Sequence, residues 1–173
     1  MTGIILYQSK YGATKQYADW LAEATGFPVV ETKKADIRQV AQCDTIILGG
    51  GVYASGIAGL SFLRRHIGRL QGRKVIVFAV GAAPCDGETL QRLAAHNMKD
   101  ALAGVKLFYC RGAWDMAAMG FIDRTLCAML KKASQQDPAS VEPWMASLMT
   151  DSPQPCDWTD RGSITPILRE AGF

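Results

Sequence analysis

The sequence predicts an α/β fold in which a doubly wound parallel β-sheet carries helices on both faces. Short apolar runs, most of them rich in β-branched or aromatic residues, alternate along the chain with stretches whose apolar residues have helical spacing. Such alternation needs a crossover connection between successive strands, which favours a parallel sheet that is buried on both sides. Five apolar runs in this rhythm predict a five-stranded sheet with the strand order 2-1-3-4-5.

Each predicted element rests on its own stretch of residues. The strands are expected at Ile4–Tyr7, Pro28–Val30, Thr45–Leu48, Val75–Val80 and Val105–Cys110. Helical spacing of apolar residues is found from Ala13 to Ala24, Leu60 to Leu70, Leu90 to Met98, Ile122 to Leu130 and Trp144 to Met149. Gln135–Pro138 is expected to end the fourth of these helices, and a short last helix is expected over Ser163–Glu170 with Pro166 near its first turn.

The length and composition of the chain limit the class of protein to which it can belong. With 173 residues, of which 49% are hydrophobic and 20% charged, it is expected to form one globular domain over residues 1–173, on which a C-terminal extension from roughly 136 to 173 packs. No apolar run approaches the ~18 residues of a membrane span. The N-terminus opens on a strand rather than on a signal peptide, so a cytoplasmic location is expected.

Charge and cysteine usage argue against several functions. The five cysteines have no C-x-x-C spacing and the two histidines lie far from them in sequence, so we expect reduced thiols and no metal site. The net charge of +3 is too small to indicate a nucleic-acid partner. The sequence offers no catalytic triad and no paired acid cluster, which agrees with chemistry carried by a bound cofactor. Catalytic residues and the oligomeric state stay open.

The turn from Ser9 to Thr14 is the first candidate site. It joins the first predicted strand to the first predicted helix, where backbone N–H groups have no intrahelical partner and the helix dipole favours an anion. Ser9 and Thr14 can add hydroxyl donors, and Gly12 lets the backbone curl around a phosphate. The candidate binding residues are Ser9, Lys10, Tyr11, Gly12, Ala13 and Thr14. The alternative is that these residue types act only as helix caps.

Two further turns are expected at the same edge, because ligands of open α/β sheets bind where the strand order reverses. After the third strand, Gly49–Gly56 is expected to be a loop that a flat ligand can approach closely, with Tyr53 as an aromatic face. After the fourth strand, Gly81–Gly87 is again small and turn-rich. The candidate residues are Gly50, Gly51, Val52, Tyr53, Ala54, Gly81, Ala82 and Ala83. A flexible connection is the alternative for the glycine run.

The first turn resembles the S/T-x-T-G-x-T phosphate loop of the flavodoxins. Ser9, Gly12 and Thr14 match this pattern, whereas Tyr11 and Ala13 replace the usual Thr and Asn, so two donors of the family's phosphate cradle are absent or changed. The resemblance implies a flavodoxin-like fold and an FMN cofactor. It also implies that the turns after the first, third and fourth strands hold this cofactor.

The chain is more specifically similar to the flavodoxin-domain branch that contains the menaquinone-dependent protoporphyrinogen oxidases. The residues that carry this resemblance are Tyr7-x-Ser9-Lys10-Tyr11-Gly12-x-Thr14-Lys15, Gly49-Gly50-Gly51-x-Tyr53, Phe108-Tyr109-x-Arg111-Gly112, Phe121-Ile122-Asp123-Arg124 and Asp157-Trp158-Thr159-Asp160. It implies an FMN-dependent oxidoreductase that takes hydride equivalents from a tetrapyrrole and passes them to a quinone or another small redox partner.

The segment after the fifth strand is the candidate for substrate contacts. Arg111 can pair with a carboxylate such as a porphyrin propionate, and Trp114 can receive a flat apolar partner. The favoured alternative for Trp114 is that it covers the core beside the last helix. The basic stretch Arg64–Lys74 is expected on a solvated face, and it would also suit peripheral contact with the inner face of an anionic membrane.

Two other functions stay open at this point. A flavodoxin that acts as a diffusible electron carrier fits the fold, but such carriers resemble one another in being strongly acidic, and this chain carries +3. A flavin-free module that binds another phosphorylated ligand fits the altered residues Tyr11 and Ala13.

Overall fold

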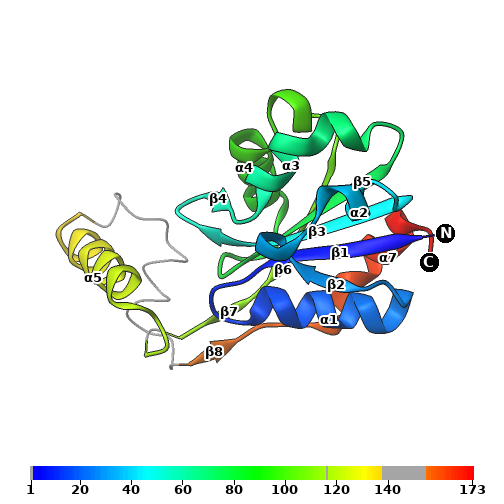
Figure 1. Ribbon diagram of the computed structural model, residues 1–173. Coiled ribbons are helices and arrows are strands. Elements are labelled where there is room, and N and C mark those ends of the chain that lie inside the picture. Colours follow the sequence, from blue (N-terminus) through cyan, green and yellow to red (C-terminus); the bar gives the residue numbers. More distant parts are fainter. Residues whose placement is uncertain (1, 116, 138–154) are drawn as a thin grey trace.

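The protein, seen in a computed structural model that describes residues 2–115, 117–137 and 155–173, is a parallel sheet between two layers of helices (Figure 1). The strands are β1 (Gly3–Gln8), β2 (Val29–Glu31), β3 (Thr45–Tyr53), β4 (Gly56–Ile57), β5 (Lys74–Gly81), β6 (Lys106–Arg111), β7 (Ala113–Trp114) and β8 (Cys156–Asp157). The α-helices are α1 (Ala13–Thr25), α2 (Ile37–Val40), α3 (Leu60–His66), α4 (Gly87–Asn97), α5 (Phe121–Gln136) and α7 (Thr165–Ala171). Short 3-10 helices are η1 (Thr32–Lys34), η2 (Ile67–Leu70), η3 (Asp100–Leu102) and η5 (Arg161–Ile164).

The strand order confirms the predicted fold. The parallel strands follow the order β2-β1-β3-β5-β6, which is the predicted 2-1-3-4-5 once the short β4, antiparallel to β3, is set aside. Leu6 of β1 pairs with Leu48 of β3, and Leu48 pairs in turn with Val77 of β5. The carboxyl ends of these strands therefore lie at one edge, and the order reverses between β1 and β3.

The apolar runs bury side chains on both faces of the sheet. Ile4 and Leu6 join one core cluster, with residues of α3 and α4, whereas Ile5 between them joins the other, with residues of α1 and α7. This alternation is repeated in β3 and β5, and it explains why the runs are continuously apolar. Figure 1 shows the same division, with α1 and α7 on one side of the sheet and α2, α3 and α4 on the other.

The glycine run at the end of the third strand is not a loop. β3 continues through Tyr53, so Gly49, Gly50 and Gly51 are buried strand residues. Gly49 and Gly50 pair with both β1 and β5, and Gly51 pairs with β5. A methyl group on Gly49 would lie 2.1 Å from the ring of Phe78, and one on Gly50 would lie 2.1 Å from the carbonyl oxygen of Ala58. The glycines are therefore required by close packing, and the expected loop shrinks to the turn between β3 and β4.

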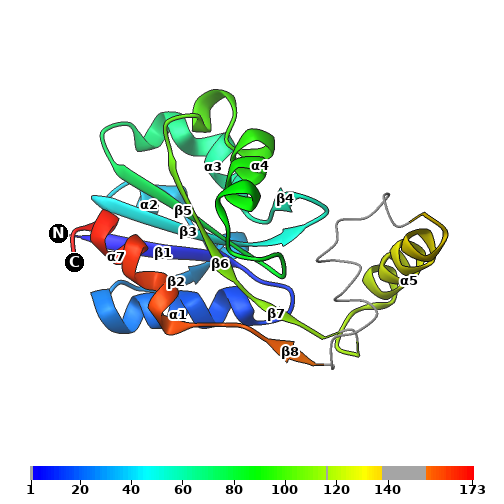
Figure 2. The ribbon, with the colours of Figure 1, turned by 180° about the vertical axis from the view of Figure 1, so that it is seen from behind.

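Helix α5 forms where the spacing predicts it, but several of its large apolar side chains are exposed. Figures 1 and 2 show α5 standing away from the sheet layers. Phe121, Ile122 and Met129 are 85%, 72% and 64% exposed. Helical spacing identifies the helix from local sequence, whereas burial of its apolar face depends on a neighbour that spacing does not specify.

The C-terminal residues pack on the α1 face. Ile164, Ile167 and Ala171 join the core cluster that includes Ile5, and Pro166 lies in the first turn of α7. The expected helical segment from Trp144 to Met149 lies outside the described residues. None of the helices in the described part of the chain combines the length and apolar character needed to cross a membrane.

Candidate functional site

The turn between β1 and α1 adopts a conformation that its glycine requires. Gly12, the residue before α1, has a φ of 96°, a region that side chains with a Cβ rarely adopt, and nothing lies within 4 Å of where its Cβ would be. Lys10, Tyr11 and Gly12 are exposed, whereas Thr14 packs beneath the turn with 2% exposure. The turn thus presents open backbone at the carboxyl edge of the sheet.

Backbone amides at the start of α1 are available to an anion. The Ser9 hydroxyl accepts a hydrogen bond from the Gly12 amide at 3.0 Å, which closes the turn and leaves the Ser9 O–H hydrogen free to donate. Among the described residues, none accepts a hydrogen bond from the amides of Ala13, Thr14 or Lys15. Unpartnered amides at a helix N-terminus are the donor set that binds phosphate groups. The residues present therefore fit a phosphate.

An acidic side chain from α5 already contacts this turn. The carboxylate of Asp123 accepts hydrogen bonds from the Lys10 ammonium group and the Tyr11 hydroxyl. The bond from Lys10, followed by that from Tyr11, lowers the pKa of Asp123, and the same contact raises the pKa of Lys10. In this structure the turn holds a carboxylate through side chains, while the amides at the start of α1 stay unpartnered.

Tyr53 folds back over the end of its own strand. Its hydroxyl accepts a hydrogen bond from the Lys10 amide at 3.0 Å, and a methyl group on Gly51 would lie 2.5 Å from that hydroxyl. Its ring meets that of Tyr11 edge to face, with centroids 6.3 Å apart. Burial raises the pKa of Tyr53, so the hydroxyl stays protonated at neutral pH. Tyr53 thus joins the end of β3 to the turn after β1.

Asn97 of α4 fixes the turn that follows Tyr53. Ala54 and Ser55 have positive φ values of 47° and 66°. The buried Asn97 side chain accepts from the Ile57 amide at 3.1 Å and donates to the Ser55 carbonyl at 2.8 Å, and these bonds hold the turn in place. Asn97 was not among the candidates predicted from the sequence, where the only signal for it is a polar side chain among the apolar positions of the helix.

The turn after β5 is held by Tyr109 of β6 and by Gly112, which directly follows β6. The Gly81 carbonyl accepts from the Gly112 amide at 2.8 Å, and the Ala83 carbonyl accepts from the Tyr109 hydroxyl at 2.9 Å. Burial raises the pKa of Tyr109, which keeps this hydroxyl a donor. A methyl group on Gly112 would lie 3.6 Å both from Ala13 Cβ and from the Gly81 carbonyl oxygen. The start of α1 and the turn after β5 therefore meet at Gly112.

Of the two candidate substrate residues, Arg111 is engaged by other residues that the structure describes, whereas the Trp114 indole nitrogen is not. The Arg111 guanidinium group lies 4.1 Å from the ring centroid of Trp158, and its Nε donates to the Ala82 carbonyl at 3.4 Å. Trp114 is half-buried in β7, and its buried indole nitrogen has no acceptor in the described part of the chain. Arg111 is thus held against the C-terminal segment by a cation–π contact.

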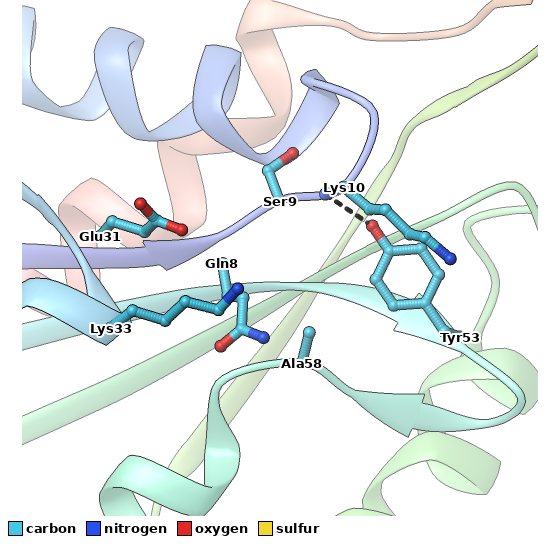
Figure 3. Close-up of a pocket in the computed structure, with 7 residues that line it drawn as sticks. All are labelled: Gln8, Ser9, Lys10, Glu31, Lys33, Tyr53 and Ala58. Carbon is cyan, nitrogen blue, oxygen red and sulfur yellow. Dashed lines mark hydrogen bonds between the residues drawn. The ribbon is translucent and has the colours of Figure 1, made fainter. Parts of the chain in front are cut away.

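A cleft of about 280 Å³ opens beside the turn, on the β2 side of Tyr53 (Figure 3). Its lining residues are Gln8, Ser9, Lys10, Glu31, Lys33, Tyr53 and Ala58. Three of them, Ser9, Lys10 and Tyr53, were candidates from the sequence. Glu31 and Lys33 were missed, although both lie where β2 ends and the rule that singled out the other strand ends applies to them equally.

Comparison with known proteins gives the following matches. A family model described as "Flavodoxin domain" matches residues 4–140. Curated protein sequences gave no significant match. Among solved structures, the Trp repressor binding protein of Bacillus subtilis is 15% identical with a TM-score of 0.47, over 65% of this chain and 85% of that one. The flavodoxin of Megasphaera elsdenii is 21% identical with a TM-score of 0.43, over 62% and 82% of the two chains.

A putative flavoprotein of Bacteroides eggerthii is 15% identical with a TM-score of 0.46, over 62% of this chain and 85% of that one. The family match covers most of the chain, including β1, the turn after it and the sheet strands that follow. The chain therefore belongs to the flavodoxin-domain family.

Proposed function

We propose that the protein binds FMN and acts as an oxidoreductase. The observation that supports this most directly is the start of α1, where unpartnered amides follow a glycine at positive φ in a chain of the flavodoxin-domain family. In this proposal, the amides of Ala13 and Thr14 and the Ser9 hydroxyl bind the phosphate, and Lys10 adds positive charge. When bound, FMN supplies hydride and electron transfer.

The remaining residues of the site bind and orient in this proposal. Tyr53 provides an aromatic wall beside the phosphate turn, and its hydroxyl can release the Lys10 amide to an incoming phosphate oxygen. The hydrogen bonds that the Gly81 and Ala83 carbonyls accept hold the turn after β5 in one conformation. A site whose backbone is fixed before the ligand arrives loses less conformational entropy on binding.

The reaction we propose is dehydrogenation of a tetrapyrrole of the protoporphyrinogen type with a quinone as acceptor. In each turnover two electrons and two protons leave the tetrapyrrole, and two electrons and two protons convert the quinone to a quinol. The residues shared with the protoporphyrinogen oxidase branch support this reaction, and so does the net charge of +3, which suits an anionic substrate better than it suits a carrier that docks on basic partners.

FMN binding is tested with the purified protein. We expect it to bind FMN at least about 100-fold more tightly than riboflavin, because riboflavin lacks the phosphate and leaves the amide donors unused. Release of FMN on denaturation, measured by chromatography, would agree with this. Equal affinity for FMN and riboflavin, measured by flavin fluorescence, would contradict the phosphate turn, and absence of any flavin binding would favour the flavin-free module.

The reaction is tested by anaerobic reduction of the flavin-loaded protein. We expect protoporphyrinogen to bleach the flavin absorbance and a quinone to restore it. Reduction by NAD(P)H with a reductase, without any reaction with protoporphyrinogen, would instead identify an electron carrier.

A further inference from the structure

A second cleft, of about 290 Å³, lies next to the cleft beside the phosphate turn. The two share Gln8 and Lys33, so a ligand in one can extend into the other. The second cleft lies between η1, which supplies Lys33, and α3, which supplies Arg65 and His66. It is therefore built from elements that the sequence analysis did not connect with the site.

The second cleft carries positive charge that no side chain among the described residues pairs with. Lys33 and Arg65 line it, and no aspartate or glutamate does. Neither cation forms an ion pair or a side-chain hydrogen bond in the described part of the chain. The neighbouring Arg38, in contrast, pairs with Asp36 at 2.8 Å. Two unpaired cations around one cleft favour an anionic ligand.

Polar and aromatic groups complete the second cleft. The Thr32 hydroxyl donates to Gln8 Oε1 at 2.8 Å, which leaves the Gln8 NH₂ group as a donor where the two clefts meet. The rings of Phe62 and His66 pack edge to face with centroids 4.9 Å apart and give the cleft an aromatic side. The arrangement suits a carboxylate or phosphate attached to an apolar or aromatic body.

We propose that this second cleft binds the anionic group of the small molecule that exchanges electrons with the flavin. The carboxylate or phosphate is held by Lys33 and Arg65, and the body of the molecule extends past Gln8 toward Tyr53. This inference rests on the proposed flavin function for its role, while the preference for an anion is a property of the cleft itself. It assigns to Lys33 and Arg65 the contact that the sequence assigned to Arg111.

The test compares two variants that carry the same change in charge. The double variant Lys33→Gln/Arg65→Gln removes both cations of the cleft. The control Lys34→Gln/Arg69→Gln removes two exposed cations nearby that line neither cleft. Because all four side chains are exposed, both variants are expected to fold, which circular dichroism checks.

Two matched pairs of probes separate anion recognition from contacts with the rest of the ligand. Protoporphyrin IX and its dimethyl ester differ in two carboxylates, and NADPH and NADH differ in one phosphate. We expect the wild-type protein to bind the anionic member of at least one pair more tightly than its matched partner. The cleft variant should bind that anionic probe about tenfold more weakly than wild type. Its affinity for the matched partner, and the affinity of the control variant for both probes, should change by less than about twofold. Added salt should weaken the same binding in wild type.

The outcomes distinguish the ligand source and the two proposals. Weakening for protoporphyrin IX alone identifies a carboxylate, and weakening for NADPH alone identifies a phosphate. The inference would be overturned if the cleft variant lost equal affinity for both members of a pair, or if the control variant lost as much affinity as the cleft variant. It would also be overturned if the cleft variant lost no affinity for either anionic probe. The measurement is made with and without FMN. If the protein binds no flavin, the proposed function is disproved, but the affinities measured without FMN still show whether the cleft selects anions.

Discussion

Glycines at two strand ends of the same sheet edge have different physical roles. Gly12, after β1, has a φ of 96° and nothing within 4 Å of where its Cβ would lie. Gly49, Gly50 and Gly51, at the end of β3, have ordinary strand conformation, but a Cβ on any of them would lie 2.1 to 2.5 Å from a neighbouring atom. The first glycine is needed for its backbone conformation, and the other three for close packing.

This difference decides what each region can contribute to a site. The Gly12 turn is open and ends in amides that have no partner among the residues the structure describes, so a ligand can reach it directly. The glycine run of β3 is covered by Phe78, Ala58 and the Tyr53 ring, so it contributes the position of Tyr53 rather than an open surface. A glycine-rich sequence alone does not distinguish an accessible backbone from a packed one.

The largest effect on stability is expected for Gly50→Ala. Its methyl group would lie 2.1 Å from the Ala58 carbonyl oxygen. That oxygen cannot easily move away, because the Ala58 amide donates a 2.9 Å hydrogen bond to the Gly51 carbonyl and so holds this backbone in place. We expect the free energy of unfolding to fall by about 3 kcal/mol in urea titrations. Gly68→Ala, where nothing lies within 4 Å, is the control and should lose almost nothing; equal losses would refute the packing role.

The next largest effect is on ligand affinity, for Gly12→Glu. A carboxylate at this position would repel the phosphate, so we expect FMN affinity to fall about 100-fold. Gly26→Glu is the matched control, because Gly26 lies at the other end of α1 with a φ of 72° and equally open surroundings. Both variants should lose about 1 kcal/mol of stability from strain at positive φ. Wild-type FMN affinity in Gly12→Glu would contradict the site assignment.

A smaller effect of opposite sign is expected for Asp123→Asn. The carboxylate contacts Lys10 and Tyr11 of the turn, and its negative charge disfavours a second anion there. We expect FMN affinity to rise about fivefold in fluorescence titrations, since the variant removes one repulsive charge from a solvated site. Asp19→Asn, which removes an exposed carboxylate paired with Lys15 at 2.7 Å, should change affinity by less than about twofold.

The pH dependence of the Asp123 contact follows from its pKa. Because the hydrogen bonds from Lys10 and Tyr11 lower the pKa of Asp123, the carboxylate stays charged across the neutral range, and the contact is lost only as the pH falls through this lowered value. The ratio of the FMN affinity of Asp123→Asn to that of wild type should therefore stay constant around neutral pH. A fall in affinity on substitution would show that Asp123 positions Lys10 for the phosphate instead.

The smallest effect is expected for Tyr53→Phe. The variant keeps the ring over Gly51 and removes only the hydroxyl that accepts from the Lys10 amide. We expect the free energy of unfolding to fall by about 1 kcal/mol, the usual contribution of one hydrogen bond. Thermal and urea unfolding would measure it. A loss as large as that of Gly50→Ala would mean that the hydroxyl, rather than the packing of the glycines, holds the end of β3.

The accuracy of the sequence predictions differs between kinds of element. The strand order follows from alternating apolar runs and a general connection rule, and it was confirmed without any knowledge of side-chain contacts. The Gly12 turn was also placed correctly, because a strand and a helix define it from both sides. The glycine run was wrongly placed in a loop, because the Phe78 ring that fills the space over Gly49 belongs to a strand almost thirty residues away.

The sequence by itself determined the layers, the strand order and the position of the turn between β1 and α1, because periodicity and chain direction are local properties. Only the tertiary structure decided which side chains meet at that edge. It brought Asp123 to Lys10, engaged Arg111 with Trp158, and placed Lys33 and Arg65 around one cleft. Such contacts join residues far apart in the chain and depend on packing geometry, which no single stretch of sequence contains.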